Sequence, residues 1–162
     1  MLQEIYNNMG IIGWIHFVAA VLSLITGTYV LFITKGTAFH KKVGYVYFVS
    51  MIIVIVTAFM IYRLFGGWGI FHWFACLSTF ALVGGMAPMF KKNRTGKDLE
   101  QHAEVMGWSV VGLYCAFISE TGSRLFMEYA MWIIPIGCGV TCFLGSFLIR
   151  KSKKTYSSIF GT

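Results

Sequence analysis

The chain has 162 residues, of which 57% are apolar, 17% aromatic and only 12% charged, and its formal net charge is +7. About a quarter of an average soluble domain is charged, and a water-soluble globule of this size could not cover so much apolar surface. These values exclude a secreted mini-protein and a disordered tail. Nucleic-acid binding is excluded too, because the basic residues are distributed in the way that orients a membrane protein.

Five apolar runs are long enough, or nearly so, to cross a bilayer as a helix. In chain order they are Ile11–Ile33, Val43–Tyr62, Trp68–Phe90, Val105–Ser119 and Tyr129–Ile149. The first run follows polar residues such as Gln3 and Glu4, and it is too long for a cleavable signal peptide. The sequence therefore predicts an all-α integral membrane bundle of five transmembrane helices, forming a single transmembrane domain over residues 1–162.

Basic residues are distributed unevenly over the segments that connect these runs. Eleven would lie on one side of the membrane: Lys35, Lys41, Lys42, Lys91, Lys92, Arg94, Lys97, Arg150, Lys151, Lys153 and Lys154. Only Arg63 and Arg124 would lie on the other side. Because connections rich in Lys and Arg stay in the cytoplasm, we expect the N-terminus outside and the C-terminus inside, in a multi-pass protein of the bacterial inner membrane.

All four cysteines fall inside predicted spans: Cys76, Cys115, Cys138 and Cys142. This placement excludes a disulfide framework and a zinc-ribbon spacing. Cys138 and Cys142 share a helix face, which could suggest a soft-metal site, but a cysteine buried in a membrane is far more often a small apolar filler. The last predicted helix carries no histidine. It is expected to pack at the periphery, or to form a homodimer contact through Gly137, Gly139 and Gly145.

The four histidines form two pairs, each near one face of the membrane. His16 and His72 lie at the outer starts of the first and third runs, and His40 and His102 at the inner starts of the second and fourth. Ionisable groups at the border of a span are costly and are functional candidates. The positive end of a helix disfavours imidazolium, so we expect the neutral rings that coordinate metals.

One imidazole from each of two helices is the arrangement that holds a six-coordinate b-type haem. The outer and inner histidine pairs would thus bind two haems, roughly 25 Å apart along the membrane normal. The candidate cations for the haem propionates are Arg63, Arg124 and Lys41, with Lys35 and Lys42 beside the last. Each also has a simpler role: Arg124 could pair with Glu120 on the same helix face, Arg63 could snorkel at a helix end, and the lysines could anchor the topology.

A short basic string and five single residues carry a resemblance to a known family. They are Lys35-Gly36-Thr37-Ala38-Phe39-His40-Lys41-Lys42-Val43-Gly44, then His72, His102, Met106, Glu120 and Arg124. Over roughly Gly10 to Arg124 the chain resembles the bacterial predicted membrane proteins called domain of unknown function 2306 (DUF2306), which implies a membrane fold and no settled activity. The placing of histidines on four successive helices is also similar to the cytochrome b561 class of di-haem electron carriers, as an architectural analogy.

These observations favour a di-haem electron carrier, a membrane oxidoreductase that is linked to quinol or acts as a transmembrane reductase. Its partners would be membrane lipid and a quinone or redox protein. The alternative is a zinc, iron or quinone site at the cytoplasmic mouth of His40 and His102, completed by Asp98, Glu100 or Glu104. A non-catalytic accessory membrane protein is the third hypothesis. No motif for hydrolysis or phosphate binding occurs, so any catalysis would be electron transfer by a bound cofactor.

Overall fold

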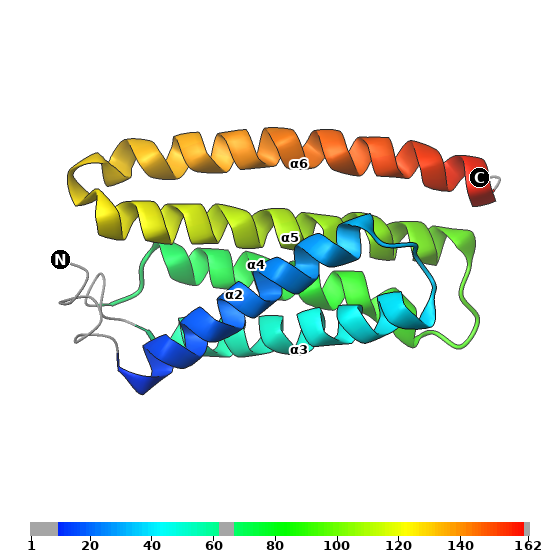
Figure 1. Ribbon diagram of the computed structural model, residues 1–162, viewed down its shortest axis with the longest axis horizontal. Helices are drawn as coiled ribbons and strands as arrows, with labels where there is room; N and C mark the ends of the chain where they lie inside the picture. The colour runs from blue at the N-terminus through cyan, green and yellow to red at the C-terminus, as the bar shows by residue number, and fades with distance from the viewer. Residues whose placement is uncertain (1–9, 62–66, 161–162) are drawn as a thin grey trace. The chain divides into compact units, whose positions relative to one another are not determined.

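The computed structural model describes residues 10–61 and 67–160, with the backbone alone for residue 127 and residues 151–160. The elements are α2 (Ile11–Phe32), α3 (Ala38–Met60), α4 (Ile70–Met86), the 3-10 turn η1 (Ala87–Phe90), α5 (Gly96–Leu125), the 3-10 turn η2 (Met127–Tyr129) and α6 (Ala130–Phe160) (Figure 1). No strand occurs in these residues. The prediction of an all-α fold is therefore confirmed.

Four of the helical segments are long and apolar enough to cross a membrane: Ile11–Phe32, Ala38–Met60, Ile70–Phe90 and Ala130–Arg150. They correspond to the first, second, third and fifth predicted runs. The fourth run lies inside α5, which is less apolar because charged residues such as Asp98 and Arg124 stand in its first and last turns. The chain is thus a multi-pass membrane protein with four candidate spans among its described residues.

The chain divides into two compact units, one ending at Cys76 and the other beginning at Leu77. In the first unit, α2 and α3 pack against each other as an antiparallel hairpin (Figure 1). The expected single domain over residues 1–162 stays a prediction. The small residues Ala19, Ala20, Ser23 and Gly27 of α2 are buried. At this interface Ser23 Oγ donates to Ser50 Oγ at 2.8 Å.

The turn between α2 and α3 explains much of the basic string. Lys35 Nζ donates to the carbonyl oxygens of Val30 and Leu31, which the end of α2 leaves without helical donors. Gly36 has φ +79°, a left-handed conformation that other residues rarely adopt. Thr37 accepts from His40 N at 3.1 Å and caps α3. This cap starts α3 at Ala38, five residues before the predicted Val43.

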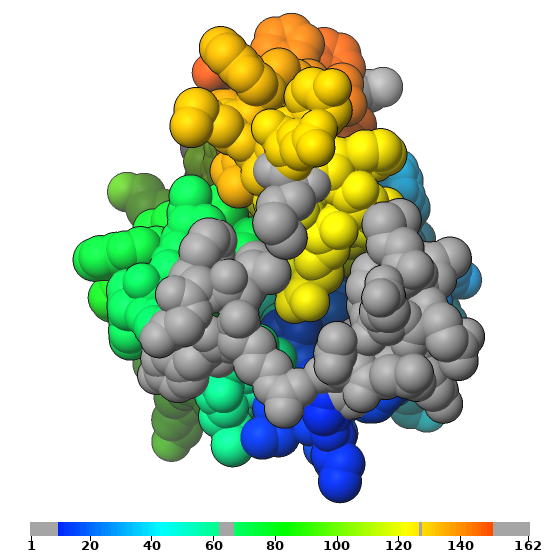
Figure 2. All heavy atoms as spheres, turned by 90° about the vertical axis from the view of Figure 1, so that its left-hand side faces the viewer, coloured from blue at the N-terminus to red at the C-terminus, as the bar shows by residue number. Residues whose placement is uncertain are grey.

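In the second unit, α5 and α6 run antiparallel and side by side (Figure 1). Glycines on both helices receive branched side chains of the other: Gly107 faces Ile149, Gly145 faces Val111, Gly137 faces Ile118 and Gly122 faces Ile133. In these pairs the residue number rises along α5 as it falls along α6, as expected for antiparallel helices. Figure 2 shows the end at which the two helices meet through η2, in yellow and orange.

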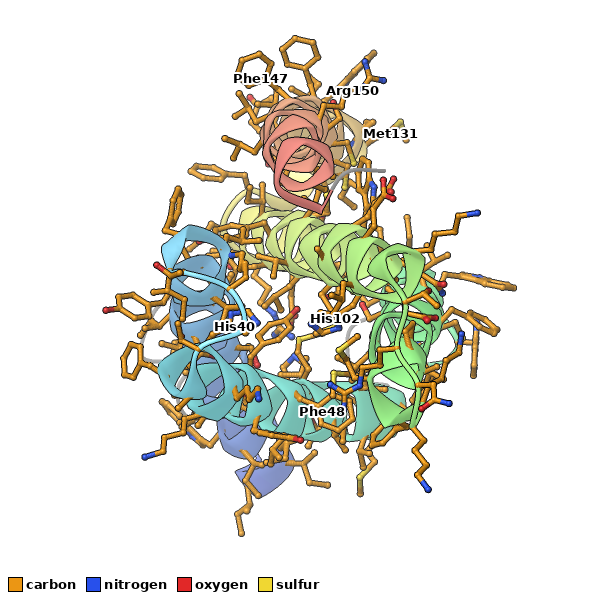
Figure 3. The ribbon with its side chains drawn as sticks, turned by 90° about the vertical axis from the view of Figure 1, so that its right-hand side faces the viewer. His40, Phe48, His102, Met131, Phe147 and Arg150 are labelled. Atoms are coloured by element: carbon orange, nitrogen blue, oxygen red, sulfur yellow. The ribbon has the colours of Figure 1, made fainter. Side chains whose placement is uncertain are left out.

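This packing assigns two of the three glycines that were candidates for a homodimer contact. Gly137 and Gly145 are used within the chain, because a Cβ at either position would collide with α5. Gly139 has open space around it. The opposite side of α6 is apolar and exposed, and Phe147 points away from α5 there (Figure 3). The packing of α6 on α5 alone therefore leaves a broad surface for lipid.

Candidate functional site

His16 is held by a short relay between α2 and α3. Its Nδ1 lies 2.8 Å from Thr57 Oγ1, and Thr57 Oγ1 itself donates to the Ile53 carbonyl oxygen at 2.6 Å. A hydroxyl has one hydrogen, so Thr57 must accept from the ring, and Nδ1 of His16 carries the proton. In a neutral ring this arrangement leaves a lone pair on Nε2, which is the atom that coordinates metals.

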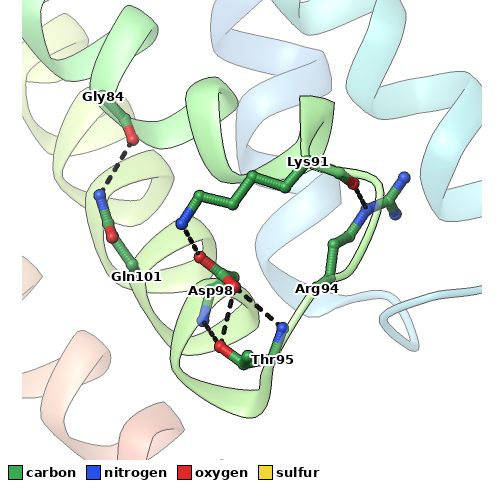
Figure 4. A network of polar contacts seen from close by, with 6 residues as sticks. All are labelled: Gly84, Lys91, Arg94, Thr95, Asp98 and Gln101. Atoms are coloured by element: carbon green, nitrogen blue, oxygen red, sulfur yellow. Dashed lines mark hydrogen bonds and ion pairs between the residues drawn. The ribbon is translucent and has the colours of Figure 1, made fainter.

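His102 is held in the same way, by a backbone carbonyl. Its Nδ1 lies 2.8 Å from the carbonyl oxygen of Gly85, near the end of α4. A carbonyl can only accept, so Nδ1 donates and Nε2 of a neutral ring again keeps its lone pair. The contact needs glycine at this position, because a Cβ on Gly85 would lie 2.6 Å from Met106 Sδ. Next to it, Gln101 Nε2 donates to the Gly84 carbonyl oxygen (Figure 4).

His72 has the opposite hydrogen-bond polarity. Gly69 N donates to His72 Nδ1 at 3.1 Å, so a neutral ring carries its proton on Nε2. Gly69 precedes the first residue of α4 and His72 is the third, which makes the contact one half of a capping box. The ring is 3% exposed and stacks on Trp68 with 4.9 Å between ring centroids. His72 therefore has a structural role at the start of α4, which was not predicted from the sequence.

The two outer histidines also contact different sides of α3. His16 bonds Thr57, whereas the ring of His72 lies 6.5 Å from that of Phe59. Positions two residues apart point about 200° apart around a helix. The pairing of His16 with His72 as ligands of one haem stays a prediction, and the N–H that His72 presents at Nε2 counts against it.

His40 is the third residue of α3 and is half-buried, with its Nδ1 atom shielded from solvent. It lies on the same helix as Phe48 (Figure 3). Lys41, the expected propionate partner, is exposed. His40 and His102 belong to different units, so their pairing remains a prediction.

The acidic residues near His102 are only partly available as ligands. Asp98 accepts from Thr95 N at 2.9 Å and from Thr95 Oγ1 at 2.8 Å, and it forms an ion pair with Lys91 (Figure 4). The Lys91 contact, followed by the Thr95 hydrogen bonds, lowers the pKa of Asp98 to about 2. This capping box starts α5 at Gly96, nine residues before the predicted Val105. His102 consequently lies in the second turn of a helix rather than before one.

Glu100 and Glu104, the other two carboxylates of the predicted zinc or iron site, are half-buried. Among the described residues, no three His, Cys, Asp or Glu side chains are grouped so that they could hold a metal ion. Because Asp98 is used as a cap, Glu100 and Glu104 are the carboxylates left for the non-haem alternative, which stays a prediction.

Of the two outer arginines, the structure describes only Arg124. Arg124 Nη2 and Nε donate to Glu120 Oε1 at 2.7 and 3.2 Å, so the simpler role proposed for Arg124 is confirmed. Arg63 lies outside the described residues. Their contact with haem propionates stays a prediction for both.

A model of the family described as predicted membrane protein (DUF2306) matches residues 13–150. The match covers most of the chain and extends beyond Arg124, where the resemblance in the sequence ended, into α6. No curated protein and no solved structure matches the chain. The likeness to the cytochrome b561 class is not confirmed by these comparisons.

Proposed function

Because the chain belongs to the DUF2306 family of predicted membrane proteins, we propose a function within the membrane: it carries electrons through b-type haem held by histidine Nε2 atoms. The observation that carries the proposal is the hydrogen bonding of His16 and His102. Each donates from Nδ1 to a fixed acceptor of another helix, Thr57 or Gly85. Metal-ligating histidines almost always donate their second ring nitrogen in this way, which fixes the ring and raises its basicity.

The four histidines do not have equal roles in this proposal. His16 and His102 are the primary ligands, one for a centre near each face. His40, shielded at Nδ1, is the second ligand near the inner face. For His72 to bind iron through Nε2, its proton must move from Nε2 to Nδ1. The ring then loses the hydrogen bond from Gly69 N, and Nδ1 must donate to another acceptor. When bound, haem b would supply a one-electron iron couple, and the histidine ligands would hold it in place for electron transfer.

The fifth predicted span is part of the proposal, and the register of α5 against α6 supports it. If Ala130–Arg150 crosses the bilayer, α5 must cross beside it, because Gly107 and Gly122 lie against the two ends of that segment. No Asp, Glu, Lys or Arg occurs between Glu104 and Glu120. With five spans, the basic connections lie on the cytoplasmic side and the N-terminus lies outside the bacterial inner membrane. The electron partner is a quinone or a redox protein.

A visible spectrum of the purified protein tests the proposal. We expect a reduced-minus-oxidised haem b signal, with one centre lost in His16→Ala and the other in His102→Ala. His72→Gln is the matched variant, because glutamine at the third position of a helix can still accept from the capping N–H. If His72 acts as a cap alone, this variant keeps both centres. Protein that stays colourless after expression with added haem precursor would overturn the proposal.

A further inference from the structure

Three of the four cysteines gather where α5 packs on α6. Cys115 Sγ lies 3.8 Å from Cys142 Sγ and 3.8 Å from the Cys138 carbonyl oxygen. Cys138 Sγ in turn lies 3.3 Å from Ser119 Oγ. The sequence predicted apolar fillers at these positions, but a filler does not require two sulfurs from different helices to touch.

The helices approach closely at this point. One turn along α6 from Cys142, Gly145 receives the Val111 side chain, which lies one turn along α5 from Cys115. A short distance between the helix axes is what a bond between two side chains as short as cysteine needs. The two sulfurs differ in access, because Cys142 is exposed and Cys115 is 3% exposed. Redox-sensitive cysteines are accessible and often lie next to a second cysteine that resolves the oxidised one.

We propose that Cys142 and Cys115 are an oxidant-sensitive pair that forms a disulfide between α6 and α5 when a lipid-soluble hydroperoxide reaches the bilayer. The apolar class of the oxidant follows from the position of Cys142 on a membrane-spanning helix, between exposed residues such as Val140 and Phe143. A charged or strongly polar oxidant would not enter this environment.

The chemistry proceeds in two balanced steps. First, the Cys142 sulfur attacks one peroxide oxygen, so that an S–O bond forms and the O–O bond breaks. The hydroperoxide is reduced to an alcohol, which takes up the thiol proton, and Cys142 becomes a sulfenic acid. Second, the Cys115 sulfur attacks the Cys142 sulfur, the S–S bond forms, and the hydroxyl group leaves as water with the Cys115 proton. The oxidation thus stops at a reversible stage.

The test uses the full chain in lipid nanodiscs, treated with cumene hydroperoxide after thiol reduction. We expect the intact mass to fall by two hydrogens and peptide mapping to find Cys115 joined to Cys142. The same loss is expected in Cys138→Ser and Cys76→Ser, which are the matched controls. In Cys115→Ala the sulfenic acid has no partner, so Cys142 should gain oxygen atoms instead. The readout is sulfur chemistry and does not depend on bound haem.

Two results would overturn the proposal. One is a wild-type protein in which Cys142 gains oxygen without losing hydrogens, since Cys115 would then not act as the resolving thiol. The other is a disulfide that maps to Cys138 or Cys76. Cys142→Ser offers a further check, because it should leave the remaining thiols unmodified at the hydroperoxide concentration that oxidises the wild type completely.

Discussion

Two antiparallel hairpins of this protein are held together by different means. Between α2 and α3 the contacts are polar, from His16 to Thr57 and from Ser23 to Ser50. Between α5 and α6 the contacts of Ser119 and the cysteines are flanked by steric ones, because glycines let branched side chains approach the backbone of the other helix. Small residues at helix interfaces are usual in membranes, where lipid provides no hydrophobic drive between helices.

Under the proposed function, the difference separates an interface that orients a haem ligand from one that does not. A buried hydroxyl or imidazole in a membrane must have a fixed partner, so the polar interface orients His16 as well as joining two helices. The glycine interface joins α5 to α6 without orienting a ligand. We therefore expect changes at α5–α6 to affect stability most, and changes at α2–α3 to affect the electronic properties of a bound cofactor.

The largest effect is expected from Gly145→Val and Gly122→Val. A Cβ at either position would overlap a side chain of the opposite helix, and overpacking of this kind costs about 1–3 kcal/mol for each site. Thermal unfolding in detergent should show the loss, and the double variant should fail to fold. Gly139→Val is the control, because open space surrounds that position. If all three variants had equal stability, the steric account of the α5–α6 interface would be wrong.

Polar contacts also stabilise the second unit, at the start of α5. Thr95→Ala removes a capping side chain and should lower the free energy of unfolding by about 0.5–2 kcal/mol. The hydrogen bonds and ion pair of Asp98 hold its pKa at about 2, below the ordinary 3.8. Its contribution is therefore complete above about pH 4 and is lost as the pH falls toward 2.

Unfolding measured at pH 5 and at pH 3 should show this loss in the wild type and a weaker dependence in Asp98→Asn. Asparagine keeps an acceptor for the Thr95 N–H but has no acid to titrate. The same pH dependence in both proteins would place the titrating group elsewhere.

Thr57→Val and Ser50→Ala compare two polar contacts of the same hairpin. Each removes one interhelical hydrogen bond, which in membranes averages about 0.6 kcal/mol, so their effects on unfolding should be similar. Only Thr57→Val also releases Nδ1 of His16, and it should shift the midpoint potential of the outer centre in a redox titration. Thr57→Ser should restore it. If Ser50→Ala shifted the potential by the same amount, the hydrogen bond at His16 Nδ1 would not be the cause of the shift.

The smallest effect is expected from Arg124→Gln. Its partner Glu120 lies four residues earlier on the same helix and both side chains are partly exposed, a geometry worth about 0.3–0.5 kcal/mol. The variant should leave the outer centre unchanged in a redox titration, since both donating nitrogens already contact Glu120. A clear shift of the potential would return Arg124 to the role of propionate partner.

The apolar runs predicted where helices occur, but not where two of them begin. The helices α3 and α5 start earlier than predicted, because Thr37 and Thr95 supply caps within segments that hydropathy marks as connections. The pattern Thr95-x-x-Asp98 is a recognisable capping signal and could have placed the second start.

The roles of the histidines could not be predicted in the same way. Whether a ring nitrogen donates or accepts depends on the atom that faces it, and for His16 and His102 that atom belongs to another helix. The case of His72 is local, since its partner Gly69 is only three residues away. A helix start placed after Gly69 would have suggested the cap from the sequence.

The turn at Lys35, Gly36 and Thr37 has a consequence for how the protein enters the membrane. Because it satisfies the backbone groups at the end of α2 and the start of α3, the two helices can fold into a hairpin before either is surrounded by lipid. Ser23 and Ser50, which are 0% and 2% exposed, then meet each other rather than hydrocarbon. Insertion of α2 and α3 as one hairpin avoids the stage at which either hydroxyl would lie unpaired in the bilayer.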